Sequence, residues 1–354
     1  MATERVVIAM SGGVDSSVAA ALLVEQGYDV VGLSMQLYDQ REGGQQWGSC
    51  CTLDDLRDAA RVASRLGIPH YIVNFEEQFR RVVVADFVEE YAAGRTPLPC
   101  AHCNTDLKFS TLLERAHALD ATSLATGHYA RIERDDSGRW LLKRGLDAEK
   151  DQSYFLFGLT QPQLAAAHFP VGALSKPTVR EHARRLGLTV ADKRDSQEVC
   201  FIPDHDYASF VDARATASGG VIVDEQGRTL GTHAGVHRFT VGQRKGLGLS
   251  SSVPLFVVAL DAPSQTVTVG PKPSLERTQL TASRVNWIAT DPPPGEIRAQ
   301  AQIRHRHPPA PCRVRMIGDG RVECHFDAPQ IAITPGQAVV FYDGDTVVAG
   351  GWID

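Results

Sequence analysis

The 354-residue sequence has no apolar run close to the roughly 20 residues that a membrane-spanning helix needs, which excludes a protein built on such helices. Its first residues, MATERVVIAMSGG, contain no basic leader and no cleavage-like site, so we expect no secretion and a cytoplasmic location. The seven cysteines are an odd number, which argues against a framework of structural disulfides. The formal net charge of -6 neither requires nor excludes an RNA partner, because a local patch matters more than the total.

The sequence does have enough length and apolar content for more than one domain. At about 100–200 residues per domain, two or three domains fit. Hydrophobic residues make up 43% of the chain, so a sizeable core is available. The 31 glycines and 19 prolines, many of them in the second half, predict numerous turns there.

Residues 1 to about 205 alternate between short apolar runs and amphipathic stretches. The predicted strands are 5–10, 28–35, 70–75 and 123–126, and the predicted helices are 14–26, 53–66 and 104–119. Strands joined by helices in this rhythm indicate right-handed crossovers and a parallel sheet. We therefore predict an α/β nucleotide-binding domain over 1–205, with the ligand at the C-terminal edge of its strands.

After about residue 205 the segments become short and alternate with period two between glycine and proline residues, which is typical of antiparallel β structure. Two β-rich units are predicted, with a boundary near 271–276. The expected domains are a small central domain over 206–275 and a C-terminal β-barrel over 276–354.

The strongest single signal is AMSGGVDSS at residues 9–17, between a predicted strand and a predicted helix. Gly12 and Gly13 allow a tight backbone turn without a Cβ in the way. The loop N–H groups and the helix N-terminus then point at one anion. The serine hydroxyls could add donors, and Asp15 could hold a magnesium ion that bridges phosphates.

Two common phosphate-binding signatures are missing at this point, G-x-x-x-x-G-K-[ST] and G-x-G-x-x-G. An ordinary glycine-rich turn is the alternative to a phosphate site. The motif S-G-G-x-D-S resembles the pyrophosphatase loop of the ATP-pyrophosphatase (PP-loop) superfamily. Its members cleave ATP between the α and β phosphates and attach AMP to a substrate oxygen, so the resemblance implies adenylation rather than kinase or GTPase chemistry.

Five further motifs narrow the resemblance to one family. They are TPLPCAHCN with the following Lys108-Phe109, ATGHYAR, KDQSYF, DSQEVCF and GQRKGLG. Together with the loop, and in the same order and spacing, they resemble the bacterial tRNA 2-thiouridylase (MnmA) family over nearly the whole chain. That family makes 2-thiouridine at the wobble position of the tRNAs for Glu, Gln and Lys, so the resemblance implies ATP, Mg²⁺, tRNA and a persulfide sulfur-donor protein as reaction partners.

The family's functional residues map onto this sequence position by position. Cys103 matches the catalytic nucleophile and Cys200 the cysteine that carries the persulfide. The expected ATP contacts are Ala9, Met10, Ser11, Gly12, Gly13, Val14, Asp15, Ser16, Met35 and Gly127. The expected tRNA contacts are Leu98, Pro99, Cys100, His128, Lys150, Asp151, Gln152, Arg304, His305 and Gln337.

Two distant cysteines suit the implied chemistry, because a thiolate is a good nucleophile and exchanges readily with disulfides. AMP makes the C2 oxygen of uracil a leaving group, a persulfide on Cys200 attacks C2, and Cys103 releases the sulfur as a transient disulfide forms. The fold must then bring the two thiols together.

The sequence departs from the common family pattern just before Cys103. Many members have Pro-Asn-Pro-Asp there, whereas this chain has Leu98 at the Asn position and Cys100 at the Asp position, so an acid/base role does not transfer to Cys100. The third thiol opens a second interpretation, in which Cys100, Cys103 and Cys200 hold three irons of a [4Fe–4S] cluster. Zinc, or no shared site, is a third possibility, since a single C-x-x-C is only half of a zinc site.

A basic stretch in the last unit is the candidate RNA-binding face. Between Glu296 and Arg315, five arginines stand against one acid, a local balance of +4. The arginines are Arg298, Arg304, Arg306, Arg313 and Arg315. Alternation in 297–304 predicts an apolar face and an arginine-rich face of a strand, and such a face can contact RNA phosphates.

Two other functions remain open at this point. A small-molecule adenylating amide ligase would use the same loop, and an RNA-binding protein without catalysis would keep a vestigial one. Cys312 and Cys324 lie in period-two strands, and we expect both in the core.

Overall fold

The computed structural model describes residues 4–38, 52–194, 199–202, 206–215, 218–318 and 320–354. Its internal contacts divide the chain into two compact units. The first unit comprises Met1–Val83, Cys100–His205 and Asp345–Val347, and the second comprises Val84–Pro99, Asp206–Gly344 and Val348–Asp354. No helix within the described residues is long and apolar enough to cross a membrane.

The first unit alternates strands and helices, as the sequence predicts. Its strands are β1 (Arg5–Ala9), β2 (Asp29–Gln36), β3 (His70–Asn74), β4 (Ser123–Ala125), β5 (Ala130–Arg134), β6 (Trp140–Arg144) and β7 (Ala167–His168). Its helices are α1 (Val14–Glu25), α2 (Leu53–Leu66), α3 (Glu76–Phe79), α5 (Pro99–His102), α6 (Leu113–His117), α7 (Gln161–Ala165) and α8 (Lys176–Arg185). Two further segments, η1 (Arg80–Val84) and η2 (Cys103–Leu112), are π-helical, and η3 (Ser153–Phe155) is a 3₁₀ helix.

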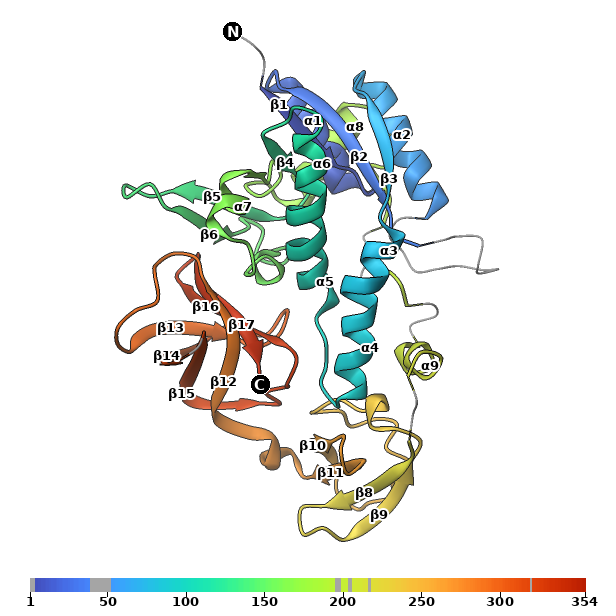
Figure 1. Cartoon of the computed structure of the whole chain (residues 1–354), viewed down its shortest axis with the longest axis vertical. Helices are drawn as coiled ribbons and strands as arrows, with labels where there is room; N and C mark the ends of the chain where they lie inside the picture. Colours follow the sequence, from blue (N-terminus) through green and yellow to red (C-terminus); the bar gives the residue numbers. More distant parts are fainter. Residues whose placement is uncertain (1–3, 39–51, 195–198, 203–205, 216–217, 319) are drawn as a thin grey trace. The chain divides into compact units, whose positions relative to one another are not determined.

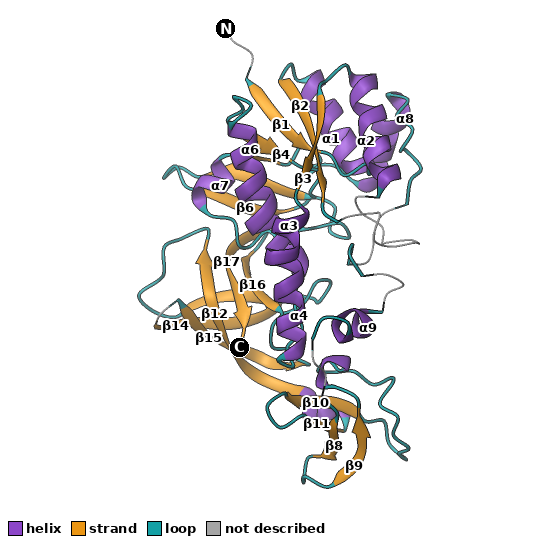
Figure 2. Ribbon diagram, turned by 45° about the vertical axis from the view of Figure 1, so that its right-hand side comes forward, coloured by secondary structure: helices purple, strands orange, loops and turns teal. Residues whose placement is uncertain are grey.

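A parallel five-stranded sheet in the order β3-β2-β1-β4-β7 is the centre of this unit, which confirms the predicted sheet. β1 and β2 are buried nearly throughout because helices cover both faces. Figure 2 shows α1, α2 and α8 on one face and α6 on the other. The chain runs outward from β1 to β3 and then returns to β4 on the other side of β1, so the loop after β1 lies where the strand order reverses, the usual ligand site of such sheets.

Helix α2 begins and ends where local chemistry dictates. Thr52 and Asp55 form a reciprocal capping box at its start. Gly67 closes it in the left-handed conformation, at φ +69°, which glycine adopts without strain. The observed bounds therefore equal the predicted range of 53–66.

The hairpin of β5 and β6 is an antiparallel insertion that the predicted strand–helix alternation did not include. Its turn depends on Asp135, whose carboxylate accepts hydrogen bonds from the backbone of Ser137 and of Arg139, each at 2.9 Å. Thr346 pairs with Lys143 on β6 within the same unit.

The second unit is mostly β structure (Figure 1). Its helical elements are α4 (Ala85–Ala92), α9 (Tyr207–Asp212), η5 (Val236–Arg238) and η6 (Lys272–Leu275). β8 (Gly220–Asp224), β9 (Thr229–His233), β10 (Phe256–Asp261) and β11 (Thr266–Gly270) form a sheet in the order β10-β11-β8-β9. The pairing of β8 with β11 is parallel, an exception to the antiparallel prediction that arises because β8 and β11 are not joined by a hairpin.

The last strands close on themselves into a barrel, which confirms the predicted C-terminal domain type. They are β12 (Glu276–Trp287), β13 (Ile297–Gln302), β14 (Ala310–Gly318), β15 (Arg321–Ile331), β16 (Ala338–Asp343) and β17 (Thr346–Ile353). The strand order is β12-β15-β14-β13-β16-β17, and β17 pairs back with β12. Cys312 and Cys324 lie inside among branched and aromatic side chains, as expected.

Candidate active site

The loop after β1 presents backbone N–H groups at the start of α1. Gly13 is the N-cap of α1, and within the described residues this N-terminus has no side-chain cap. The Ser17 hydroxyl instead donates to the Gly13 carbonyl oxygen at 2.7 Å. The N–H groups of the first turn are therefore available to an anionic ligand, and the helix dipole favours negative charge at this position.

Two glycines let neighbouring segments approach this loop. Gly12 has φ +73°, and a Cβ placed on it would lie 2.1 Å from the carbonyl oxygen of Asp55 on α2. A Cβ on Gly127, just after β4, would lie 2.5 Å from the backbone nitrogen of Ser16. A side chain at either position forces the backbone apart, so the loop is shaped by α2 on one side and by the end of β4 on the other.

The other predicted nucleotide residues lie at the same edge of the sheet. Ala9 ends β1, and the Met10 nitrogen continues the ladder by donating to the Leu33 carbonyl oxygen at 2.8 Å. Met35 lies near the end of β2 and is buried. The structure thus brings the predicted residues of β1, β2 and the β4 end together.

Asp15 in the first turn of α1 is held by a buried cation. Lys176 at the start of α8 contacts both carboxylate oxygens, at 2.7 and 2.8 Å, and is only 7% exposed. The Tyr129 hydroxyl donates to the same carboxylate at 2.8 Å. Magnesium binding by Asp15 would have to compete with this lysine, so the carboxylate as it stands is a poor fit to the predicted metal role.

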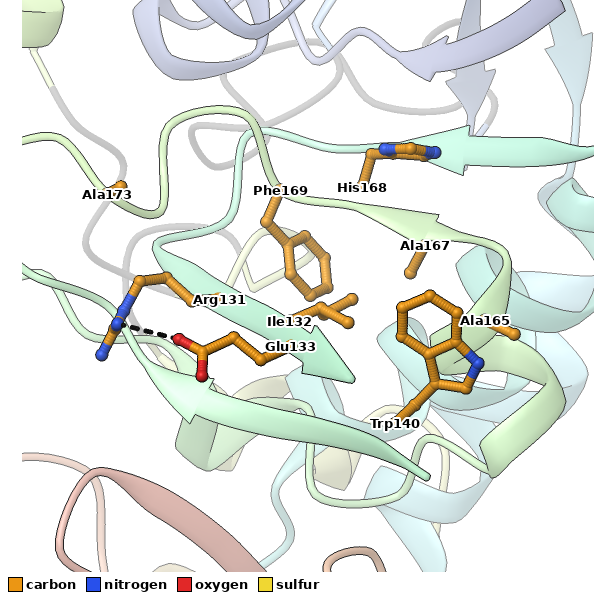
Figure 3. A pocket seen from close by; sticks show the side chains of 9 residues that line it. All are labelled: Arg131, Ile132, Glu133, Trp140, Ala165, Ala167, His168, Phe169 and Ala173. Carbon is orange, nitrogen blue, oxygen red and sulfur yellow. Dashed lines mark hydrogen bonds and ion pairs between the residues drawn. The ribbon is translucent and has the colours of Figure 1, made fainter. Parts of the chain in front are cut away.

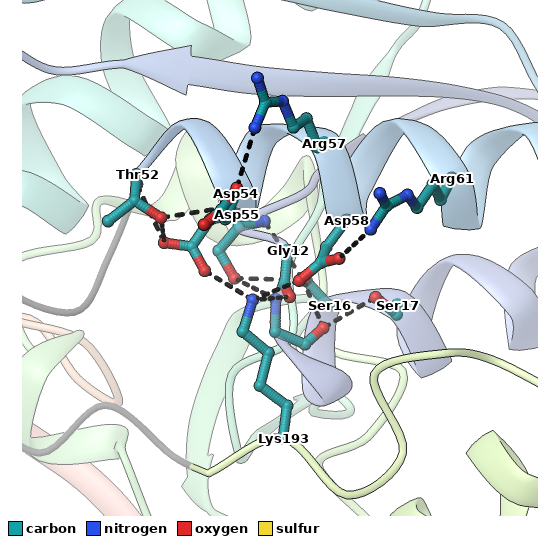
Figure 4. Close-up of polar contacts among 12 residues, drawn as sticks. Gly12, Ser16, Ser17, Thr52, Asp54, Asp55, Arg57, Asp58, Arg61 and Lys193 are labelled. Atoms are coloured by element: carbon teal, nitrogen blue, oxygen red, sulfur yellow. Dashed lines mark hydrogen bonds and ion pairs between the residues drawn. The ribbon is translucent and has the colours of Figure 1, made fainter. Parts of the chain in front are cut away.

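A second lysine, Lys193, contacts the loop at Gly12, as Figure 4 shows. The Lys193 ammonium group donates to Asp55 at 2.6 Å, to Asp58 at 2.7 Å and to the carbonyl oxygen of Gly12 at 3.0 Å. Burial works against its positive charge, but the hydrogen bonds to both aspartates outweigh burial and raise the pKa of Lys193.

The segments that carry the two predicted catalytic cysteines both contact the short helix α3. Cys103 begins η2, which packs against α3, and it is half-buried. Cys200 is half-buried as well, and its neighbour Phe201 packs its ring edge-on against Phe79 of α3, with ring centroids 5.4 Å apart. The fold therefore brings the two cysteine-bearing segments to one element. The residues before them, 195–198 of the DSQEVCF motif, lie outside the described part of the chain.

Cys100 lies on α5 and is exposed. Within the described residues, which include Cys100, Cys103 and Cys200, no three His, Cys, Asp or Glu side chains are arranged to hold a metal ion. The arrangement does not favour the [4Fe–4S] alternative, because that alternative needs these three thiols around one centre.

Some residues predicted to contact tRNA are engaged inside the first unit instead. Asp151 is buried, pairs with Arg144 at 2.7 Å and accepts from the backbone nitrogens of Gly145 and Ser153, each at 3.0 Å. The Gln152 side chain accepts from the Tyr129 nitrogen at 3.0 Å. Both side chains shape the backbone next to the site.

His128 follows Gly127 and is half-buried, with Nδ1 2.7 Å from the Thr126 hydroxyl. Burial and the positive charge of Lys108 hold the pKa of His128 well below its ordinary value, so the ring is neutral near pH 7. Lys150 is half-buried, and its backbone nitrogen donates to the Asp147 carbonyl oxygen at 3.0 Å.

In the second unit, Gln337 organises the backbone before Pro99. Its amide donates to the carbonyl oxygens of Thr96 at 3.0 Å and Pro97 at 3.2 Å. Leu98 and Pro99 are themselves buried. This placement gives Gln337 a structural task in addition to any contact with RNA.

The arginine-rich stretch is less positive in the fold than along the sequence. Arg298 pairs with Asp327 at 2.8 Å, Arg315 with Glu323 at 2.8 Å and Arg313 with Glu296 at 3.7 Å. Two of these acids lie on β15, the neighbour of β14. Arg304 is half-buried and His305 is exposed, and both follow β13. This strand ends two residues earlier than the predicted alternation of 297–304, at Gln302, which is buried and donates to the Arg304 carbonyl oxygen at 3.1 Å.

A cavity of about 380 Å³ lies in the first unit, and one of its lining side chains, Phe169, packs edge-on against the ring of His128, with ring centroids 6.0 Å apart (Figure 3). It is lined by the β5–β6 hairpin and the chain around β7, including Arg131, Trp140 and Phe169. None of its lining residues is a predicted site residue, so it does not enlarge the candidate active site.

Sequence reasoning missed three side chains that touch the loop or its aspartate, namely Tyr129, Lys176 and Lys193. One local signal was present for Lys176. It occupies the first position of a helix, where the helix dipole disfavours a cation, so an anionic partner was to be expected. Nothing local identifies Lys193, because its partners come from the loop before α1 and from α2.

Comparison with known proteins assigns the chain to a family along its whole length. Residues 4–204 match the tRNA methyl transferase HUP domain, 208–271 the tRNA methyl transferase PRC-barrel domain and 277–353 the aminomethyltransferase beta-barrel domain. A solved 4-thiouridine synthetase–RNA complex with bound ATP aligns with 59% of this chain and 50% of its own, at 14% identity and a TM-score of 0.36, too low to support an argument.

Full-length relatives carry a more specific name than the domain descriptions. The tRNA-specific 2-thiouridylase MnmA of Geotalea uraniireducens is 53% identical, covering 99% of this chain and 95% of its own. The protein of the same name from Geobacter metallireducens is 52% identical, covering 100% of this chain and 97% of its own. With a parallel-sheet domain, a pyrophosphatase-type loop and two cysteine segments meeting at one helix, the chain belongs to the tRNA-specific 2-thiouridylase (MnmA) family.

Proposed function

We propose that this protein is an ATP-dependent tRNA 2-thiouridylase that adenylates C2 of a wobble uridine and replaces its oxygen by sulfur. The observation that carries the proposal is the pairing of an uncapped helix N-terminus at Gly13 with two cysteine segments, at Cys103 and Cys200, in one compact unit. The first feature suits ATP phosphates, and the second suits sulfur transfer.

The loop is a good fit to the phosphates of ATP. The N–H groups at the start of α1 would bind the phosphates, with Lys176 and Lys193 supplying positive charge on either side. The uridine O2 attacks the α-phosphorus, the bond to the bridging oxygen breaks and pyrophosphate leaves. Since Lys176 already contacts Asp15, we propose that any Mg²⁺ arrives with the ATP phosphates and is not held in advance by that carboxylate.

Sulfur transfer then consumes the Cys200 persulfide and the Cys103 thiolate. The terminal sulfur of a persulfide on Cys200 attacks C2 and forms a bond to carbon while the C2–O bond to AMP breaks. The Cys103 thiolate attacks the Cys200 sulfur, so the sulfur–sulfur bond breaks and a Cys103–Cys200 disulfide forms. The outer persulfide sulfur remains on C2 at the level of sulfide while the two cysteines end as a disulfide, and an external thiol reductant must supply two electrons to reduce that disulfide.

The target base has to leave the stack of the anticodon loop, because C2 of a stacked base is not accessible to a nucleophile. We propose that His128, Lys150 and the Arg304–His305 stretch contact the tRNA. The neutral His128 ring would act as a hydrogen-bonding or stacking group rather than as a phosphate-binding cation.

The remaining expectations extend this proposal. The substrates would be the tRNAs for Glu, Gln and Lys, a persulfide-carrying protein would supply sulfur, and the reaction would take place in the cytoplasm. We place the domain limits after residues 205 and 275. Cys100, exposed on α5 at the family's Asp position, would face the RNA rather than take part in sulfur transfer.

The test measures two products in one reaction. The purified protein is incubated with ATP, a persulfide donor and unmodified tRNA, and AMP and 2-thiouridine are quantified by mass spectrometry. We expect both to form with a tRNA that has a wobble uridine, and neither with the same tRNA carrying cytidine at that position. AMP formation that proceeds equally well without tRNA would contradict the proposal and favour the small-molecule ligase.

A further inference from the structure

The second unit contains a cavity of about 450 Å³ that the proposed function does not use. It is lined by the start of α9, the chain around η5 and the loop 242–248, which carries the GQRKGLG motif. Three lining residues have rings, Tyr207, His233 and Phe239, and a fourth is Arg238. A volume of this size lies in the range of pockets that hold small ligands.

The loop 242–248 is preformed by its own hydrogen bonds. The Gln243 side chain accepts from the Thr240 nitrogen at 3.0 Å and donates to the Lys245 carbonyl oxygen at 2.9 Å. The Gly242 nitrogen donates to the Val257 carbonyl oxygen at 2.8 Å, and the Val257 nitrogen donates back to Gln243 at 2.9 Å. All three glycines of the motif have a positive φ, which glycine adopts without strain. The backbone that presents the charged side chains of this loop is therefore fixed before a ligand binds.

The chain around this cavity is basic. Residues 226–260 contain four cationic side chains and no acidic one, although the whole chain has a formal net charge of -6. Arg244 and Lys245 are exposed, and within the described residues neither side chain forms an ion pair or a hydrogen bond. Three of the arginines in 298–315, by contrast, are paired with acids. The loop therefore keeps positive charge that the fold neutralises in much of the arginine-rich stretch.

Arg238 adds a hydrogen-bond donor to the wall of the cavity. One of its terminal nitrogens pairs with Asp212, whereas its Nε is buried and has no hydrogen-bond acceptor among the residues that the structure describes. Native proteins pair most of their buried polar groups, so an N–H group without an acceptor at a cavity wall suits a ligand that carries acceptor atoms. A ligand with a flat ring, acceptor atoms and negative charge fits this lining.

We propose that the cavity and the loop 242–248 bind one unstacked nucleotide of the RNA substrate, with residues other than those proposed for the target uridine. This inference rests on the proposed function, which supplies the RNA. The base enters the cavity beside Tyr207 and accepts a hydrogen bond from Arg238, while the exposed cations of the loop hold the adjoining phosphates. Rings combined with cations are the usual way in which proteins bind single-stranded nucleotides. The ring-lined cavity favours a base over a side chain of an acidic peptide.

The first test removes the phosphate contacts. Binding of an unmodified tRNA transcript is measured by filter binding at several salt concentrations. Arg244→Ala with Lys245→Ala should reduce the slope of log affinity against log salt concentration by about 1.5, because two phosphate contacts no longer release counterions. Arg228→Ala with Lys272→Ala is the matched control, since it removes two charges from exposed positions that do not line the cavity. Its slope should equal that of the wild type.

The second test fills the cavity without changing the charge. Ala234 is an exposed lining residue, so Ala234→Phe places a ring in the space proposed for the base. We expect tRNA binding to weaken at least about 5-fold, the low end of the effect of one stacked base, with an unchanged salt slope. Circular dichroism checks the fold. If Ala234→Phe is unfolded, Ala208→Phe fills the same cavity from α9.

The outcomes distinguish the inference from the function on which it rests. Wild-type affinity in the folded cavity variant overturns the inference, and so does an equal loss of slope in the loop variant and its control. A loop variant that binds tRNA normally but no longer accepts sulfur from a persulfide-carrying protein also overturns it, in favour of a protein partner. In these cases 2-thiouridine formation by the wild type leaves the proposed function intact. Wild-type protein that forms no 2-thiouridine, while the variants show the expected losses of tRNA binding, removes the proposed function and supports the pocket.

Discussion

The two units of this protein use the same side chain in opposite ways. In the first unit Cys103 and Cys200 are half-buried in segments that contact a short helix, whereas in the second Cys312 and Cys324 lie inside the barrel with 0% of their surface exposed. A hydrogen bond with the neighbouring Cys312 thiol, together with burial, raises the pKa of Cys324 far above its ordinary value. Because the thiolate is the reactive form, we expect the environment of each thiol, and not the residue type, to decide whether it can react.

The largest expected effect comes from replacing either of the two half-buried cysteines of the first unit, Cys103 or Cys200. Cys103→Ser or Cys200→Ser should each lower the rate of 2-thiouridine formation at least about 1,000-fold, because a hydroxyl can neither carry a persulfide nor form the disulfide. Single-turnover assays with persulfide supplied in excess measure this loss. Wild-type rates in both variants would refute the assignment.

The buried cysteines of the barrel, Cys312 and Cys324, supply the matched control. Cys324→Ala should leave the thiolation rate within about 2-fold and lower the free energy of unfolding by about 1 kcal/mol, since it only shrinks a packed side chain. Chemical denaturation measures the free energy of unfolding, and the same activity assay measures the thiolation rate. A large loss of activity with an intact fold would break the contrast between the units.

The two units also differ in the charge that they bury. The first unit buries Lys176, whereas the core of the barrel is apolar. Lys176→Met and Asp15→Asn should each destabilise the fold by about 3 kcal/mol, the usual result of removing one partner from a buried ion pair. The double variant should recover much of that stability and none of the ATP-dependent activity. Urea titration with AMP formation as the second readout tests the pair, and restored activity in the double variant would exclude a role in ATP binding.

The outer face of the barrel offers a third test. Arg304→Ala should weaken tRNA binding several-fold and reduce the salt dependence of binding, because each phosphate contact releases counterions. Arg315→Ala is the control, since Glu323 at 2.8 Å already neutralises that side chain. Filter binding at two salt concentrations measures both. If both variants lose tRNA affinity equally, then an ion pair within the fold does not predict which arginines contact RNA.

The smallest expected effect is a pH dependence that originates in the first unit. Burial first, and Lys108 second, lower the pKa of His128 in the folded state, while the unfolded chain keeps an ordinary value of about 6.5. Below that pH the unfolded state binds more protons, so the free energy of unfolding falls as the solution is acidified and is constant above it. Thermal unfolding between pH 7.5 and 5 should show a shallower slope for His128→Gln, and an unchanged slope would place the effect elsewhere.

Local signals allowed much of the fold to be predicted. The limits of α2 follow from the residues that flank it, and the parallel sheet follows from apolar runs such as β1 and β2. The β5–β6 hairpin was missed because a short alternating run between helices does not reveal its pairing partner. The glycine loop and the cysteines were identified because their motifs are contiguous.

What could not be predicted depends on residues distant in sequence. The charge of the arginine stretch was overestimated because Glu323 and Asp327 come from a neighbouring strand, which only the register reveals. The prediction that Asp15 could hold magnesium did not foresee its partner Lys176, which lies 161 positions away. Lys193, 181 positions from Gly12, gives no local sign of its role.

These separations have a consequence for the protein during its synthesis. The phosphate loop is synthesised before the two lysines that contact it, since Lys176 follows Asp15 by 161 residues and Lys193 follows Gly12 by 181 residues. A nascent chain that ends before Lys193 therefore has the loop without its counter-charges and should hold nucleotide poorly. ATP affinity would then arise late in translation, and its onset would report that the sheet and α8 have assembled.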